Sequence, residues 1–416
     1  MIDLSTQIDV LIIGGGPSGL AAASELKTRG VARVVVLERE PSAGGIPRHC
    51  GHPPFGMREF KRVLTGPQYA KRLVARAIED GVEIHCDTTV VEMRQGGKML
   101  ITSDDGPLEI SAKRVIYATG VRETPRSARI IGGQRPLGVM NTGALQSMVF
   151  LKKRKPFLRP VIVGTELVSY SAIQTCRHMG IKPVAMLEKS VRPSARWPFT
   201  MFAPLTFVPV HYSTSINKII GDKRVEAVEV IDGDGKTRII ECDGVLLTGE
   251  FTPESTLGRC GHLTVDNGTG GPVIDQFGRC SDPVYFSCGN LLRPVETGGW
   301  SWNEGRQIGG FVADDLGGKL PDANNKIDVV VEGDVLKYAT PQRLNLSASI
   351  VGLKHIQLRF TRRAKGILTA THNGKTIWQK SISSQRERRI LIPISALMAG
   401  LGDLGGSETI VLTVKK

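Results

Sequence analysis

The sequence predicts an α/β protein with two Rossmann-like dinucleotide-binding domains plus a small C-terminal antiparallel β-domain. Three observations support this prediction. An apolar strand, a glycine-rich turn and a helix open the chain, and the same order returns near residue 160. After about residue 324 the sequence changes to short segments that alternate apolar and polar residues. This alternation is typical of half-buried strands, whereas strands that alternate with helices indicate a parallel sheet.

The first segment has the complete order of a dinucleotide-binding unit. The run IDVLIIGGG (8–16) is typical of a buried parallel strand, and Gly14, Gly16 and Gly19 satisfy G-x-G-x-x-G. A helix follows, and a second strand (32–40) carries Glu38 near its end. Such glycines allow a tight turn and close approach to a pyrophosphate, while the helix N-terminus offers N–H groups to phosphates. Glu38 can accept hydrogen bonds from a ribose.

Two later segments carry short motifs where a strand ends. The run KRVIYATGVRETPR (113–126) is a buried strand that ends in Ala118-Thr119-Gly120. A strand beginning near residue 282 ends in Cys288-Gly289-Asn290, and a helix follows from about Thr297.

In their order, these motifs resemble the two-dinucleotide-binding-domain flavoproteins with the pyridine nucleotide-disulfide oxidoreductase fold. The resemblance covers residues 8–318 and implies FAD as cofactor. It implies that FAD is bound by Gly14, Gly16, Pro17, Ser18, Gly19, Glu38, Arg39, Gly45, Thr119, Gly120, Gly289, Asn290 and Thr297. It also places the N-terminus of the helix after Thr297 at the flavin pyrimidine edge. One motif departs from the family, because Asn290 stands where an Asp is expected; an Asn side chain still accepts and donates hydrogen bonds.

The second glycine fingerprint is incomplete. In RPVIVGTELVS (159–169) only Gly164 matches, while Glu166 and Ser169 stand at the second and third glycine positions. A carboxylate about 4 Å from a phosphate charge is repelled by roughly 4 kcal/mol at an effective dielectric constant near 20. NAD(P) is therefore only a possible second cofactor. If a nicotinamide dinucleotide binds here, Gly164 and Glu188 contact it, and Glu188 favours NAD over NADP.

These motifs predict the domain boundaries. Residues 1–125 and 245–320 form a discontinuous FAD-binding domain, with an NAD(P)-binding-like domain at 126–244 between its two parts. Residues 325–416 form the C-terminal β-domain, in which Asn373-Gly374 marks a hairpin and RRILIPISAL (388–397) is predicted as a strand. We expect this domain to act in structural support or in oligomer contact; the alternative is that it docks a partner.

The stretch GGIPRHCGHPPFGMREF (44–60) holds the candidate catalytic residues His49, Cys50 and His52. Four interpretations remain open: a metal site, a reactive thiol, a histidine proton donor or base, and a rigid loop beside the flavin or at a subunit contact. No distant fourth ligand is evident, so we predict no metal. Because the stretch has one cysteine, it cannot form the internal disulfide of the disulfide reductases.

Residues 44–73 also resemble a narrower group, the FAD subunits of multi-component amine and amino-acid dehydrogenases of the opine oxidase, hydrogen cyanide synthase and dye-linked proline dehydrogenase type. This resemblance implies a small-molecule substrate and a partner flavoprotein subunit; the alternative is a homo-oligomer. Several members carry a Cys-rich iron–sulfur segment near the C-terminus. Here no cysteine follows Cys288, so we expect no cluster.

Composition excludes other classes. The net charge is +14, but the basic residues are scattered and lack interleaved aromatic residues, so we expect no nucleic-acid partner. The seven cysteines form no C-x-x-C pair and no apolar run has the length of a membrane span, so we expect a reduced, cytoplasmic protein. The favoured function is the FAD-binding subunit of a multi-component dehydrogenase or oxidase. The alternatives are a stand-alone NAD(P)H-dependent flavin oxidoreductase and a non-catalytic nucleotide-binding scaffold.

Overall fold

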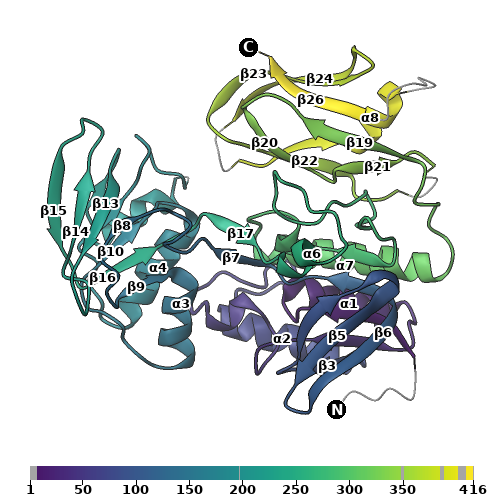
Figure 1. The fold of residues 1–416 in the computed structure, drawn as a ribbon, viewed down its shortest axis with the longest axis horizontal. Helices are drawn as coiled ribbons and strands as arrows, with labels where there is room; N and C mark the ends of the chain where they lie inside the picture. The colour runs from purple at the N-terminus through teal and green to yellow at the C-terminus, as the bar shows by residue number, and fades with distance from the viewer. Residues whose placement is uncertain (1–6, 196, 348–350, 385–387, 402–408, 416) are drawn as a thin grey trace. The chain divides into compact units, whose positions relative to one another are not determined.

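The computed structural model describes residues 7–195, 197–347, 351–384, 388–401 and 409–415 (Figure 1). The chain forms two compact units. The first comprises Met1–Gly45, Ala70–Val121 and Pro253–Lys416, and the second comprises Ile46–Tyr69 and Arg122–Thr252. The mixed α/β fold class is confirmed, and the chain passes between the units near β7 (Val121–Glu123) and β17 (Phe251–Pro253).

The first unit is built on a seven-stranded sheet. Its parallel part has the order β3-β2-β1-β6-β18, and β6 continues into an antiparallel meander with β5 and β4. The strands are β1 (Ile8–Ile13), β2 (Val34–Leu37), β3 (Glu83–His85), β4 (Thr89–Met93), β5 (Lys98–Ser103), β6 (Gly106–Tyr117) and β18 (Tyr285–Ser287). Strands β2 and β18 are buried along their whole length, as expected for parallel strands of a sheet that is covered on both faces.

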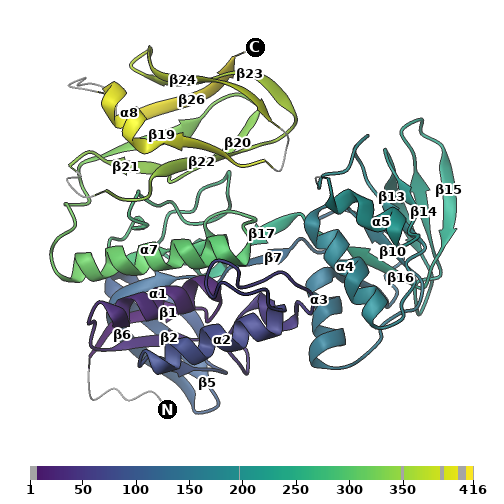
Figure 2. The ribbon, with the colours of Figure 1, turned by 180° about the vertical axis from the view of Figure 1, so that it is seen from behind.

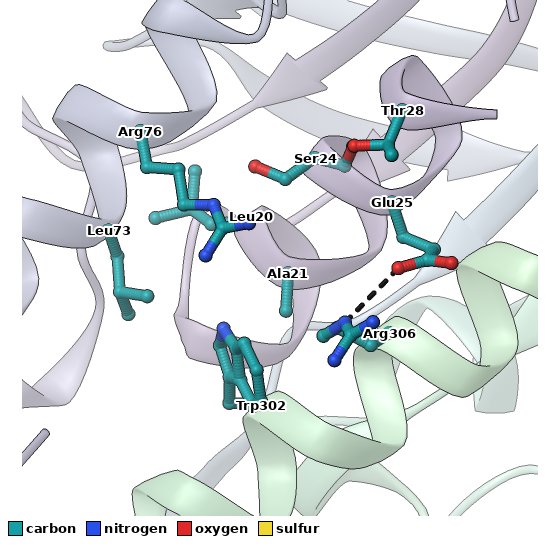
Figure 3. A pocket seen from close by; sticks show the side chains of 9 residues that line it. All are labelled: Leu20, Ala21, Ser24, Glu25, Thr28, Leu73, Arg76, Trp302 and Arg306. Carbon is teal, nitrogen blue, oxygen red and sulfur yellow. Dashed lines mark hydrogen bonds and ion pairs between the residues drawn. The ribbon is translucent and has the colours of Figure 1, made fainter. Parts of the chain in front are cut away.

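Helices α1 (Pro17–Thr28) and α7 (Gly298–Leu316) pack side by side in this unit (Figure 2). A Cβ atom built on Gly305 would lie 2.1 Å from the carbonyl oxygen of Ser18, so only glycine allows this approach. Figure 3 shows a hollow beside this packing, where Arg306 of α7 forms an ion pair of 3.1 Å with Glu25 of α1. The unit also contains α2 (Gly66–Glu79), which begins in the second unit, and α6 (Thr256–Cys260).

The second unit contains a parallel sheet of order β12-β11-β10-β16-β9 and a sheet of order β15-β14-β13-β8. The strands are β8 (Gly132–Gly133), β9 (Val139–Asn141), β10 (Pro160–Val163), β11 (Ala185–Leu187), β12 (Val210–His211), β13 (Ser215–Ile220), β14 (Ala227–Ile231), β15 (Thr237–Glu241) and β16 (Gly244–Leu247). The helices are η1 (Ile46–His49), α3 (Thr142–Gln146), η3 (Ser147–Leu151), α4 (Leu167–His178), η4 (Phe199–Met201) and α5 (Phe202–Leu205).

The C-terminal residues form a β-sandwich within the first unit. One sheet has the order β21-β19-β26-β23-β24 and the other β20-β22-β25. The strands are β19 (Lys326–Val331), β20 (Leu336–Thr340), β21 (Arg343–Asn345), β22 (His355–Phe360), β23 (Ala364–His372), β24 (Lys375–Ser384), β25 (Ile390–Pro393) and β26 (Thr409–Lys415). A shared apolar core draws residues from both sheets, including Val329, Leu358 and Leu412.

Two details of this domain differ from the sequence prediction. It is not wholly antiparallel, because β19 and β26 run parallel. The predicted strand at 388–397 stops at Pro393, and α8 (Ile394–Leu401) follows. Leu397 and Leu401 lie on the same face of α8 as Ile394 and are buried with it, a helical spacing that strand alternation cannot satisfy. Among the helices of the described ranges, none is both long and apolar enough to cross a bilayer.

Candidate functional site

The glycine turn after β1 combines tight packing with an open side. Gly14 has φ +108°, and a Cβ atom on it would lie 2.6 Å from the carbonyl oxygen of Ala118. A Cβ atom on Gly19 would lie 2.0 Å from the carbonyl oxygen of Gly14, so α1 approaches the turn closely. In contrast, a Cβ atom on Gly16 or Gly120 would meet nothing within 4 Å. The space beside Gly16 and Gly120, which follow the ends of β1 and β6, is therefore open. Dinucleotides bind at these carboxyl ends of the strands in this kind of sheet.

Helix α1 presents its N-terminus to this turn. Its N-cap is Gly16 and no side chain caps it, while Pro17 occupies the first helical position. Amide groups at such an end favour an anion. Ser18 is buried at the first turn of the helix, and a Cβ atom on Gly45 would lie 2.8 Å from the Cα atom of Gly16, so residue 45 packs directly on the turn.

The Glu38 carboxylate is fixed beside the same turn. Its Oε2 atom accepts a hydrogen bond from the amide of Gly15 at 3.0 Å, and its Oε1 atom accepts one from the amide of Glu40 at 3.0 Å. Each carboxylate oxygen has a second lone pair that can accept from a sugar hydroxyl. The next residue, Arg39, is exposed.

The motif after β18 meets the first glycine turn. Gly289 has φ +77°, and a Cβ atom on it would lie 2.4 Å from Ser18 Oγ. Its amide donates to Glu304 Oε2 at 2.7 Å. The Asn290 side chain donates to the carbonyl oxygen of Glu296 at 3.1 Å and accepts from the amide of Glu296 at 2.7 Å. An Asp side chain could not donate, so Asn at this position closes the loop that leads into α7.

Helix α7 supplies a second N-terminus that no side chain caps. Its N-cap is Thr297, and Gly298 and Gly299 form its first residues. On the β6 side, Thr119 donates through Oγ1 to the carbonyl oxygen of Glu254 at 2.8 Å, which fixes the strand end. Two helix N-termini, an open glycine turn and a fixed carboxylate suit an extended anion with a ribose, so the residues present fit a dinucleotide such as FAD.

The model of the family described as pyridine nucleotide-disulphide oxidoreductase matches residues 8–307. The chain belongs to this family. Its members are flavin oxidoreductases that use FAD together with NAD(P), so the chain is an FAD-dependent oxidoreductase, as the sequence predicts.

Individual proteins agree with this assignment. The chain is 24% identical over 406 residues to one of the opine oxidase subunits of Agrobacterium tumefaciens (strain Ach5), covering 89% of this chain and 73% of that one. Thioredoxin reductase of T. acidophilum is similar in fold, with a TM-score of 0.62, 20% identity and coverage of 74% of this chain and 98% of that chain. L-proline dehydrogenase from P. horikoshii gives a TM-score of 0.58 at 21% identity, covering 75% of this chain and 56% of that chain.

The second fingerprint is filled by side chains. Glu166 is the N-cap of α4, and its Oε1 atom accepts from the amide of Glu250 at 3.3 Å. Its Oε2 atom lies 2.1 Å from the position a Cβ atom on Gly249 would take, so the carboxylate covers the end of β16. Ser169 is fully buried, with its hydroxyl 2.6 Å from that of Thr248. Glu166 thus puts a carboxylate where the second glycine of the fingerprint would leave bare backbone, whereas Ser169 packs α4 against the end of β16.

The remaining parts of this second turn are retained. Gly164 has φ +113°, and a Cβ atom on it would lie 2.6 Å from Thr248 Oγ1. Glu188 is buried at the end of β11, where its carboxylate accepts from the hydroxyl of Thr165 and from the amide of Ser190. Glu188 therefore matches Glu38 in position, but a threonine hydroxyl replaces the amide of Gly15 as its partner.

The candidate catalytic loop is part of the second unit. Cys50 is buried, and its Sγ atom lies 3.4 Å from Gln146 Oε1 and 3.5 Å from the carbonyl oxygen of Ile46. Burial, and after it the Glu123 carboxylate, raises the pKa of Cys50 to about 12. A raised pKa disfavours the thiolate at neutral pH, so this environment does not favour the reactive-thiol interpretation; the catalytic assignment of His49, Cys50 and His52 stays a prediction.

The two histidines of the loop differ in their surroundings. His52 is half-buried, with Nδ1 3.0 Å from the carbonyl oxygen of Pro53 and its ring against Phe55. His49 lies near Gly143, since its Cε1 atom is 3.9 Å from the position a Cβ atom on that residue would take. Within the described ranges, no three His, Cys, Asp or Glu side chains form a group that could hold a metal ion. All seven cysteines lie in those ranges and are free thiols.

Sequence reasoning missed Glu123. Its carboxylate accepts from the amides of Gly143 at 2.8 Å and Gly249 at 3.1 Å, and its burial raises its pKa. It follows the Ala-Thr-Gly motif by three residues, but nothing in the local pattern distinguishes it from an exposed carboxylate. Only the meeting of three distant segments buries it.

Proposed function

We propose that this chain is the FAD-binding subunit of a multi-component dehydrogenase or oxidase that acts on an amine, an amino acid or a related small molecule. The observation that carries the proposal is the contrast between the two glycine fingerprints. The first is complete and open at Gly16, whereas in the second Glu166 and Ser169 replace two of the three glycines and the Glu166 carboxylate covers the end of β16. Electrons that do not come from a nicotinamide have to come from a substrate or from another subunit.

The chain's own residues would hold FAD in the first unit. Gly14, Gly16, Pro17, Ser18 and Gly19 would receive the pyrophosphate at the N-terminus of α1, with Glu38 accepting from the ribose; the other contacts would come from Arg39, Gly45, Thr119, Gly120, Gly289, Asn290 and Thr297. When bound, FAD supplies hydride and electron transfer at flavin N5. The N-terminus of α7 would stabilise negative charge on a flavin ring bound next to it.

The relatives support the proposed substrate class. One is named as part of an opine oxidase and a second, similar in fold, as an L-proline dehydrogenase. The first of these names describes one subunit of an oxidase. We propose that this chain likewise acts with another subunit, and that this subunit is a flavoprotein.

Flavin reduction tests the source of the electrons. The FAD-loaded protein would be mixed anaerobically with NADH, then NADPH, then amino acids and secondary amines, while the flavin absorbance is followed. We expect the nicotinamides to leave the flavin oxidised, and dithionite to reduce it. Rapid reduction by NADH would instead establish a stand-alone NAD(P)H-dependent flavin oxidoreductase and reject the proposal.

A glycine variant tests the FAD site itself. Gly16→Ala meets no protein atom within 4 Å, so the FAD-free variant should unfold at the same temperature as the wild type. A methyl group at this position would keep the backbone from the pyrophosphate, and we expect the Kd for FAD to rise at least 100-fold. Unchanged FAD affinity would show that the cofactor does not lie against this turn.

A further inference from the structure

The sheet β20-β22-β25 has one face toward the sandwich core and one face away from it. Side chains on the second face contact the segment before α7. Along β22 the side chains of Ile356, Leu358 and Phe360 enter the sandwich core. The alternate residues Gln357 and Arg359 point to the other face, as the two-residue period of a strand requires. Both of these side chains contact the segment 288–297, which links β18 to α7.

Glu296 is the main point of contact in this segment. Its side chain is only 8% exposed, and it pairs with two arginines of the C-terminal domain. Arg359 Nη2 lies 2.9 Å from Oε1, and Arg389 Nη1 lies 2.7 Å from Oε2. The Arg389 guanidinium also lies over the ring of Trp300, 3.7 Å from its centre. A carboxylate buried to this degree is costly when unpaired, so its position depends on both arginines.

A second set of hydrogen bonds, separate from those of Glu296, links the C-terminal domain to the same segment. Arg293 donates through Nε to Gln357 Oε1 at 3.0 Å and pairs through Nη2 with Glu304 Oε1 at 2.7 Å. Glu304 in turn accepts from the amide of Gly289. Burial alone would lower the pKa of Arg293, but the Glu304 carboxylate raises it, so the guanidinium stays charged. Tyr338 adds a hydrogen bond of 2.9 Å to the carbonyl oxygen of Pro294.

The contacts of Glu296 lead to the residues just before α7. The backbone of Glu296 is the partner of the Asn290 side chain, and Thr297, the N-cap of α7, follows directly. We propose that Arg359 and Arg389 are positioning residues for the cofactor site, which hold Asn290 and the N-terminus of α7 in place through Glu296. The inference rests on the proposed placement of FAD at Gly289, Asn290 and Thr297. It gives the C-terminal domain a role in cofactor binding beyond support.

The test compares Arg359→Gln and Arg389→Gln with Arg362→Gln in the full chain. Arg362 forms an exposed ion pair with Asp334 in the same domain and serves as the matched control. Two quantities would be measured: the Kd for FAD with the visible spectrum of the bound flavin, and the hydrogen exchange of residues 290–297 in FAD-free protein. If a Gln variant does not fold, Glu296→Gln, which removes the carboxylate that both arginines share, takes its place with the same expected changes.

We expect both Gln variants to raise the Kd for FAD at least tenfold, to shift the flavin spectrum and to speed exchange in 290–297 at least tenfold. Arg362→Gln should change none of these. Exchange rates and FAD affinity equal to those of Arg362→Gln would overturn the inference. If wild-type protein bound no FAD, the proposed function would fail, whereas the exchange rates would still decide whether the arginines fix this segment.

Discussion

Replacing Glu166 tests directly why the second unit would not bind a nicotinamide dinucleotide. Its carboxylate covers the end of β16, accepting from the amide of Glu250 at 3.3 Å. A phosphate about 4 Å from this charge would be repelled by roughly 4 kcal/mol at an effective dielectric constant near 20, which corresponds to about a thousandfold in Kd. Solvent screening lowers this figure, because Glu166 is only half-buried.

We therefore expect Glu166→Gly to lower the Kd for NADH by about 30- to 1000-fold. Glu166→Gln is the matched control, because it removes the charge and keeps the bulk. If repulsion dominates, Gln and Gly should give similar gains; if the side chain blocks the backbone, only Gly should improve binding. Fluorescence titration of NADH against FAD-loaded protein measures each Kd.

Two results would refute this reasoning. Wild-type protein that binds NADH with a micromolar Kd would show that the carboxylate moves aside at little cost. A Glu166→Gly variant with wild-type thermal stability and unchanged NADH affinity would show that another feature, such as buried Ser169, prevents binding.

Packing and ionisation give three further predictions. Gly305→Ala should lower the free energy of unfolding by at least about 1–3 kcal/mol in chemical denaturation, because its methyl group would lie 2.1 Å from the carbonyl oxygen of Ser18; an unchanged midpoint would contradict this packing. At pH 8, iodoacetamide should modify exposed Cys260 rapidly. It should modify Cys50 only on unfolding, because burial raises the pKa of that thiol to about 12; mass spectrometry of the peptides would show both outcomes. Burial raises the pKa of Glu123 above 4.5, so the folded protein holds a proton that the unfolded chain releases. The free energy of unfolding should therefore fall as pH rises from 4.5 through the raised pKa. Glu123→Gln should make this pH dependence weaker, and an unchanged dependence would show that Glu123 does not cause it.

Local patterns explain what could be predicted from the sequence. The order of β1, the glycine turn, α1 and β2 depends on residues within about 30 positions, where apolar runs and glycines act on the adjacent backbone. The close contact that requires Gly19 is with the carbonyl oxygen of Gly14, inside this unit, so the spacing of the glycines predicts the turn. The family assignment follows from the order of such local units along the chain, which is why the resemblance is confirmed at only 24% identity to a curated relative.

Long-range contacts explain what could not be predicted. The motif around Cys50 permits a metal ligand, a thiolate or a structural residue. Only the tertiary structure buries the thiol beside Gln146 and brings it within the field of the Glu123 carboxylate, and both effects raise its pKa.

The sequence by itself determined the fold class, the first glycine turn and the damaged second one, because each is written in neighbouring residues. Tertiary structure alone decided where the Glu166 carboxylate lies and which face of β22 meets the segment before α7. Glu296 lies about 60 and 90 positions before Arg359 and Arg389, and no periodicity of the chain relates residues so far apart. Their pairing depends on how two folded layers pack, which is a property of the whole unit.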